Sequence, residues 1–182
     1  MNASIQEQIC HFWLEDCTSK MRFQKSPEFD RQIGTRFGVW VERALLGELD
    51  SWEGAPRSTL ALVLVLDQFT RNIYRETPRM IAGDVRSLRV SIAGVERGLL
   101  EEFSPVEAQF FLMPMMHAED LHVQQASLRL FEMYCGSNVL QYAIRHRDII
   151  QRFGRFPHRN RILGRTSTPE ELLFLEQPGS RF

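Results

Sequence analysis

Four Ser/Thr-Pro pairs spread along the chain constrain its fold more than any other sequence feature. Serine or threonine caps the unpaired N–H groups at a helix start, and proline suits the first helical position because it needs no partner there. The pairs are Ser26-Pro27, Thr77-Pro78, Ser104-Pro105 and Thr168-Pro169. Glu107 and Glu171 follow the last two pairs at the spacing of a capping box. Half of the eight prolines therefore predict helix starts.

The spacing of apolar residues predicts the helices themselves. Residues 4–18 carry an apolar stripe with helical periodicity, and residues 27–46 carry a longer one that Gly47 ends. The apolar run 60–66 fits a buried strand or a buried helix, and we predict a helix over 56–69 because Pro56 can start one and its neighbours are helical. Further helices are predicted over 78–97, 105–113, 117–134 and 139–153.

No segment alternates apolar and polar residues between hairpin turns, so strands have little support. We predict an all-α fold of about eight helices in a single domain over 1–182. Short connections favour antiparallel pairs of successive helices. The chain shows no repeat near 34 residues, so any tetratricopeptide-like arrangement would lie in the structure and not in the sequence.

Composition is that of an ordinary globular protein, with 43% hydrophobic and 25% charged residues. Cys10, Cys17 and Cys135 lack the spacing of a metal site, which favours buried reduced thiols. The longest apolar run is too short to span a membrane, and the N-terminus lacks a signal-peptide pattern. We predict a soluble cytoplasmic protein without a membrane partner, and the sequence gives no indication of oligomeric state.

Positive charge is concentrated near the C-terminus. The net charge is only -1, yet residues 145–165 contain seven arginines, two histidines and one acidic residue, Asp148. Glycines and a proline interrupt this segment, which predicts an ordered loop that holds guanidinium groups at fixed angles. This arrangement is typical of an anion site.

An internal echo suggests a second half of that site. Arg71-Asn72 follows an aromatic residue after a predicted helix, and Arg159-Asn160 does the same. Arginine offers a planar fork to a phosphate or carboxylate, and asparagine adds a donor and an acceptor. The same pairs could instead cap helix carbonyls and act as structural braces. The predicted ligand-binding residues are Asp67, Arg71, Asn72, His146, Arg155, His158, Arg159, Asn160 and Arg165.

His117, Glu119 and Asp120 are the candidate catalytic residues. His117 would lie at a helix start and act as a general base that Glu119 or Asp120 orients. The alternative is that these acids simply stabilise the first turn of a helix. The spacing differs from the His-Glu-x-x-His pattern of zinc enzymes, so we predict no metal and no cofactor.

Several motifs together carry a family resemblance. They are Gly47-x-Leu49-Asp50-x-Trp52, Leu66-Asp67-Gln68-Phe69-x-Arg71-Asn72, His117-x-Glu119-Asp120 and the block 153–160 with Leu163-Gly164-Arg165 and Ser167-Thr168. The chain resembles the bacterial domain-of-unknown-function family 924, which implies an all-helical, tetratricopeptide-like fold and no established activity. Thr70 and Ala118 stand where the resemblance implies proline and serine. The missing serine disfavours a serine-dependent reaction.

Two functions remain open on the sequence alone. The first is a pocket for a small phosphate- or carboxylate-bearing ligand, with enzymatic turnover left undecided. The second is a tetratricopeptide-like module that holds a peptide through its carboxylates and backbone. A closed pocket with buried arginines favours the small ligand, whereas an open groove with exposed Asn72 and Asn160 favours the peptide. We disfavour nucleic acid, because no binding motif accompanies the basic segment and the whole chain is slightly acidic.

Overall fold

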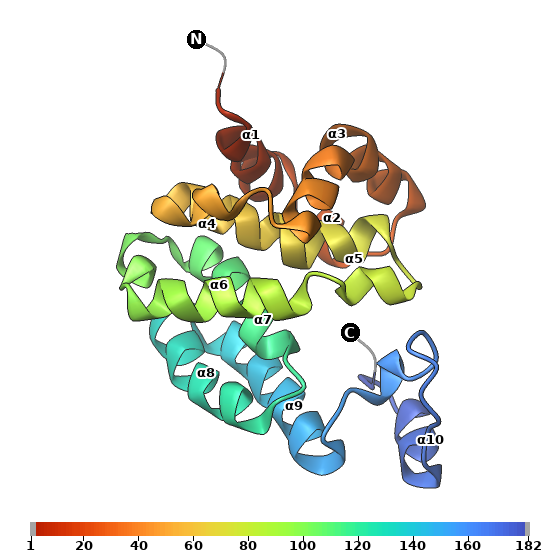
Figure 1. Ribbon diagram of the computed structural model, residues 1–182. Helices are drawn as coiled ribbons and strands as arrows, with labels where there is room; N and C mark the ends of the chain where they lie inside the picture. The colour runs from red at the N-terminus through yellow and green to blue at the C-terminus, as the bar shows by residue number, and fades with distance from the viewer. Residues whose placement is uncertain (1–2, 181–182) are drawn as a thin grey trace.

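The structure, a computed structural model, describes residues 3–180, and within that range it contains helices and no strand (Figure 1). The predicted all-α class is confirmed. The α-helices are α1 (Ile5–His11), α2 (Ser19–Phe23), α3 (Pro27–Leu46), α4 (Pro56–Val63), α5 (Thr70–Ile73), α6 (Asp84–Glu96), α7 (Pro105–His117), α8 (Leu121–Tyr134), α9 (Ser137–Phe153) and α10 (Pro169–Leu175). Two π-helical turns, η1 (Phe12–Asp16) and η3 (Leu64–Phe69), and four 3₁₀ turns, η2 (Asp50–Gly54), η4 (Pro78–Ile81), η5 (Leu99–Glu102) and η6 (Pro157–Arg159), complete the order.

Three of the four Ser/Thr-Pro pairs cap α-helices as predicted. The Ser26 hydroxyl accepts a hydrogen bond from the Phe29 N–H at 3.2 Å at the start of α3. Ser104 with Glu107 and Thr168 with Glu171 both form complete capping boxes. These local bonds fix the starts of α3, α7 and α10.

The prediction of one long helix over 78–97 is wrong. Pro78–Ile81 forms a 3₁₀ turn without a side-chain cap from Thr77, and α6 begins only at Asp84. The cause is Gly83, which lies against the backbone of η3. A Cβ atom at Gly83 would lie 2.1 Å from the carbonyl oxygen of Leu66. The predicted helix is therefore interrupted where the backbone at Gly83 contacts the backbone of η3.

The helix predicted over 105–113 continues to His117, so His117 ends α7 and does not begin the next helix. The buried side chains of Met115 and Met116 continue the packed face of α7 past Pro114. Asp120 is the actual N-cap of α8, and its carboxylate accepts hydrogen bonds from the backbone N–H groups of His122 and Val123, at 2.8 and 3.1 Å.

The centre of the fold is the apolar run that was ambiguous between helix and strand. It is helical, and every residue from Leu60 to Phe69 is buried, including Asp67 and Gln68. α4 packs against α1, α6 and α7, while η3 packs against α3, α6 and α7. Two polar side chains are therefore carried into the middle of the protein at the end of an otherwise apolar segment.

The C-terminal segment (residues 154–180) packs against α9 through a second, smaller apolar cluster. Figure 1 shows α10 set apart from the adjacent helices α8 and α9. Ile149, Ile150 and Phe156 form a small second cluster, against which Phe153 and Phe174 pack. Within residues 3–180, no helix combines the length and apolar character needed to cross a membrane.

Candidate functional site

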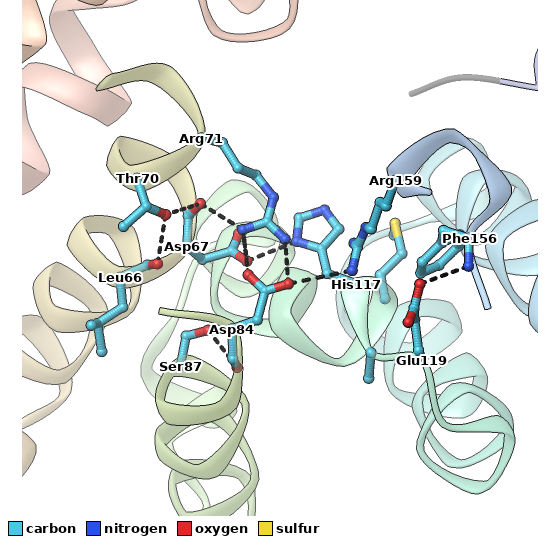
Figure 2. A network of polar contacts seen from close by, with 12 residues as sticks. Leu66, Asp67, Thr70, Arg71, Asp84, Ser87, His117, Glu119, Phe156 and Arg159 are labelled. Carbon is cyan, nitrogen blue, oxygen red and sulfur yellow. Dashed lines mark hydrogen bonds and ion pairs between the residues drawn. The ribbon is translucent and has the colours of Figure 1, made fainter. Parts of the chain in front are cut away.

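Asp67 is the centre of a buried polar network (Figure 2). It lies on the π-helical turn η3 and is fully buried. Gln68 donates a hydrogen bond to its Oδ2 at 2.6 Å, and Arg71 Nη1 lies 3.0 Å from its Oδ1. π-helical turns are rare and occur often at functional sites. A carboxylate placed on such a turn inside the core is therefore the first candidate for a functional group.

His117 reaches Asp67 from the C-terminal end of α7. Its Nδ1 lies 2.7 Å from Asp67 Oδ1, and the histidine side chain is 12% exposed. Gln124 fixes the backbone on both sides of His117, because its amide donates to the carbonyl oxygens of Met116 at 2.6 Å and Ala118 at 2.9 Å. Asp67 therefore holds the His117 ring, and Gln124 holds the backbone on either side of this residue.

The charges of this pair follow from their surroundings. Burial opposes the charge on Asp67, but Arg71 and the hydrogen bond from His117 outweigh it and hold the pKa of Asp67 below its usual range. Burial and the nearby Arg71 cation lower the pKa of His117 and outweigh Asp67. At neutral pH we therefore assign an Asp67 carboxylate and a neutral His117. Nδ1–H donates to Asp67, which leaves Nε2 as an acceptor.

Asp84 joins this pair to two arginines. Arg71 forms a bidentate ion pair with Asp84, at 2.8 and 3.0 Å, and also donates to the Asp67 carbonyl oxygen at 2.9 Å. Asp84 is the first residue of α6, directly after Gly83. The close approach of Gly83 to Leu66 thus brings Asp84 within reach of Arg71.

Arg159 meets the same carboxylate from the C-terminal segment. Its Nη1 donates to Asp84 Oδ2 at 3.4 Å, and its guanidinium lies 4.5 Å from the centre of the Phe156 ring. The side chain is 8% exposed. Burial and Arg71 lower the pKa of Arg159 to about 10, so it stays charged at neutral pH. Figure 2 shows Arg71, His117 and Arg159 converging around Asp84.

Two further arginines of the C-terminal cluster, Arg155 and Arg165, have partners within the fold. Arg155 forms a bidentate pair with Glu171 at 2.6 and 2.8 Å. Arg165 pairs with Glu119 at 2.6 and 3.0 Å, and Glu119 also accepts the Phe156 N–H at 2.8 Å. The two Glu119 contacts tie the C-terminal segment to the loop between α7 and α8.

Both asparagines of the predicted echo are also engaged within the fold. Asn72 donates to the Gln68 carbonyl oxygen at 2.9 Å and accepts from Arg75 at 3.0 Å. Asn160 donates to Ser167 and Glu171 and accepts from Arg165 at 2.9 Å. Asn72 and Asn160 are 6% and 1% exposed. The two arginines of the echo therefore meet, while the two asparagines brace their own segments.

The residue that orients His117 differs from the prediction. Glu119 faces Arg165 and Phe156, and Asp120 caps α8, whereas Asp67 contacts the imidazole. The sequence-based assignment relied on short separation, whereas Asp67 and His117 are 50 positions apart. Asp84 was missed altogether. Its signal was an acid directly after a glycine, the pattern of a helix start inside a predicted helix.

His146 and His158 lie behind the network. The His146 ring is 6.3 Å from the His117 ring and 5.7 Å from the Phe156 ring, and His158 is 5.6 Å from Phe156. Burial lowers the pKa of His146 to about 3, and burial with Arg159 lowers the pKa of His158 to about 4. Both imidazoles are neutral at pH 7.

Comparison with known proteins establishes the relationship that the motifs suggested. Residues 9–179 match the family described as bacterial protein of unknown function (DUF924). The chain belongs to the DUF924 family. Its structure is similar to that of a protein of unknown function from Agrobacterium tumefaciens, with a TM-score of 0.89 and 40% identity over 94% of this chain and 97% of that chain. A search of curated proteins found no match.

The DUF924 resemblance stated from the motifs is thus confirmed, together with the helical fold. The tetratricopeptide-like arrangement stays a prediction. Neither the family description nor the related structure names a ligand or reaction.

Proposed function

We propose that this protein binds a small ligand carrying a phosphate or carboxylate group, and that Arg159 holds the anionic group beside His117. The supporting observation is the contrast between two arginines on one carboxylate. Arg71 makes two short bonds to Asp84 and further contacts to Asp67. Arg159 makes one hydrogen bond of 3.4 Å within residues 3–180, although its side chain is nearly buried.

A guanidinium has five N–H donors, and the hydrogen bond to Asp84 involves one nitrogen of Arg159. An anionic ligand would use the donors of Arg159 that Asp84 does not. It would also compensate the desolvation that lowers the pKa of Arg159. Phosphate and carboxylate both match the arginine fork in a bidentate geometry.

The charge balance of the network is compatible with such a ligand. Asp67 and Asp84 carry two negative charges, Arg71 and Arg159 carry two positive charges, and His117 is neutral. Nε2 of His117 accepts a hydrogen bond in this state. A monoprotonated phosphate could therefore donate its O–H to Nε2 of His117 while one of its charged oxygens accepts from Arg159.

Proton transfer at His117 is the second candidate function. The Asp67–His117 contact of 2.7 Å has the arrangement in which a buried carboxylate orients a general base. In a hydrolysis, Nε2 would take a proton from water while the hydroxide attacks the ligand, and the imidazolium would return the proton to the leaving group.

Turnover is tested by incubating the protein with phosphate and carboxylate esters and following the released alcohol by proton NMR. We expect His117→Gln to abolish release while keeping ligand-induced thermal stabilisation. Release at an equal rate from wild type and His117→Gln would rule out the general-base role.

The peptide-binding alternative has less support. It called for exposed Asn72 and Asn160 in an open groove, whereas both asparagines are buried and bonded to their own segments. Their amides are not positioned to grip the backbone of a partner.

Arg159→Lys tests the ligand site. The substitution keeps the positive charge but removes the fork, so we expect ligand affinity to fall about tenfold to hundredfold, or roughly 1.5 to 3 kcal/mol. Thermal-shift measurements with a panel of phosphorylated and carboxylated metabolites, followed by calorimetry on the hits, give this value.

Arg155→Lys is the matched control, because Arg155 lies in the same segment and forms a bidentate ion pair with Glu171. It should lower the melting temperature in every buffer and leave the ligand-induced shift unchanged. A wild type that no metabolite stabilises, together with an Arg159→Lys variant that is destabilised in every buffer, would refute the ligand site and leave Arg159 as a brace.

A further inference from the structure

A groove lies beside the buried network, between α2, α7 and α9. Its volume is about 800 Å³, within the range of sites for drug-sized ligands. Apolar and aromatic side chains from all three helices line it, among them Phe23, Met116, Val139 and Tyr142. We call it the α2–α9 groove.

Two large aromatic side chains are left open to solvent at this groove. Phe23 is 57% exposed and Tyr142 is 55% exposed. The Phe23 ring is held in place by stacking on Phe110, with 6.1 Å between ring centres. Exposed aromatic residues around a concave surface are a common sign of a binding site, because covering them removes apolar area from water.

The charge of the groove selects among ligands. Lys20 is its charged lining residue, and no acidic residue is among those that line it within the described chain. His146 at the same groove is neutral at pH 7. An anionic molecule with an apolar body matches this surface, whereas a cationic one does not.

The inner end of the groove adjoins the proposed anion site. Met116 and His146 line the groove, Met116 directly precedes His117 on α7, and the rings of His146 and His117 are 6.3 Å apart. A short molecule with its apolar body in the groove would therefore have its end close to His117.

We propose that the α2–α9 groove holds the aromatic body of the ligand whose anionic group reaches His117 and Arg159, so that the ligand is a small aryl-substituted acid. This inference rests on the proposed anion site at Arg159. In this inference Phe23 and Tyr142 contact the aromatic ring of the ligand, and the positive charge of Lys20 attracts its acidic group.

Lysine labelling provides the test, because the chain has only two lysines, Lys20 and Lys25. Reductive methylation with ¹³C-formaldehyde gives each lysine its own NMR signal. Lys25 pairs with Glu76 at 3.5 Å and does not line the groove, so it is an internal control. The probes are 3-phenylpropionate, its neutral amide, and inorganic phosphate, which is an anion without an aromatic group.

We expect 3-phenylpropionate to shift the Lys20 signal, to leave Lys25 unchanged and to bind more tightly than its amide. Phe23→Ala and Tyr142→Ala should each weaken its binding about tenfold by removing an aromatic contact, without affecting phosphate. Both residues are more than half exposed, so the variants should fold. Arg159→Lys should weaken both anions, and Leu173→Ala, an exposed residue outside the groove, should weaken neither.

The outcomes separate this inference from the proposed function. If Arg159→Lys weakens both anions but Tyr142→Ala and Phe23→Ala affect neither, the groove assignment fails and the anion site stands. Binding that depends on Tyr142 but not on Arg159 would mean two separate sites and overturn the inference. Insensitivity of both anions to Arg159→Lys would refute the anion site and the inference together. A Lys20 signal that broadens with protein concentration alone would assign the groove to a second copy of the chain.

Discussion

Arg71-Asn72 and Arg159-Asn160 have the same two residue types in sequence, yet the two arginines have different surroundings. Arg71 is enclosed by Asp67 and Asp84 and makes short bonds to both residues. Arg159 shares Asp84 with it through one longer bond and otherwise lies on an aromatic ring. The comparison shows that the number of acceptors around an arginine, and not the dipeptide itself, separates a structural ion pair from a candidate ligand contact.

The largest expected effect is at Arg71. Arg71→Met would leave the Asp67 carboxylate buried without its cation, and removing one partner of a buried pair costs about 3 to 5 kcal/mol. Urea denaturation of wild type and variant measures the loss. Asp67→Asn in the same background should recover part of it, because the uncompensated charge is then gone. A loss below about 1 kcal/mol would contradict the central role of Arg71.

A pH effect of intermediate size should come from the histidines behind the network. His146 and His158 have folded-state pKa values lowered to about 3 and about 4, whereas an unfolded histidine titrates near 6.5. The unfolded chain therefore binds more protons below that pH, and stability should fall as pH drops from about 6.5 towards 4. Each buried histidine adds a slope of up to about 1.4 kcal/mol per pH unit.

Urea denaturation at several pH values, compared between wild type and His146→Asn, measures the contribution of His146. The variant should show a shallower loss over this range, and an unchanged slope would show that His146 is not buried as the neutral form. Asp67 adds its own loss at lower pH, because its depressed pKa stabilises the fold above the pKa of an unfolded aspartate.

The smallest effect is expected at Arg159. Arg159→Met keeps an apolar stem against Phe156 and leaves Asp84 paired with Arg71, so the free energy of unfolding should change by less than about 1 kcal/mol. Thermal and urea unfolding without ligand give the value. A loss as large as that of Arg71→Met would remove the distinction between the two arginines and make Arg159 a structural brace.

What could be predicted from the sequence was local. A serine cap and the proline after it act within one helical turn, so the starts of α3, α7 and α10 followed directly. The break at Gly83 was missed because its cause is the Leu66 backbone, which is remote in sequence. The two arginines of the echo do contact one carboxylate, that of Asp84, but nothing in the pattern indicated Asp84.

The orienting carboxylate of His117 was missed for a related reason. A helix-based argument pairs residues three or four positions apart, whereas Asp67 reaches His117 through the packing of η3 against α7. The ligand roles assigned to Asn72, Asn160, Arg155 and Arg165 came from the Arg-Asn echo and from the clustering of arginine near the C-terminus. The pattern did not show that each of them would have a partner within the fold.

The meeting of two arginines on Asp84 has a consequence for the nascent chain. Without the C-terminal segment, a centre made of Asp67, Asp84, Arg71 and a neutral His117 would carry a net charge of −1. Arg159 arrives last and brings that charge to zero. In the proposed function, this centre would therefore hold an anion only after the C-terminal segment has docked.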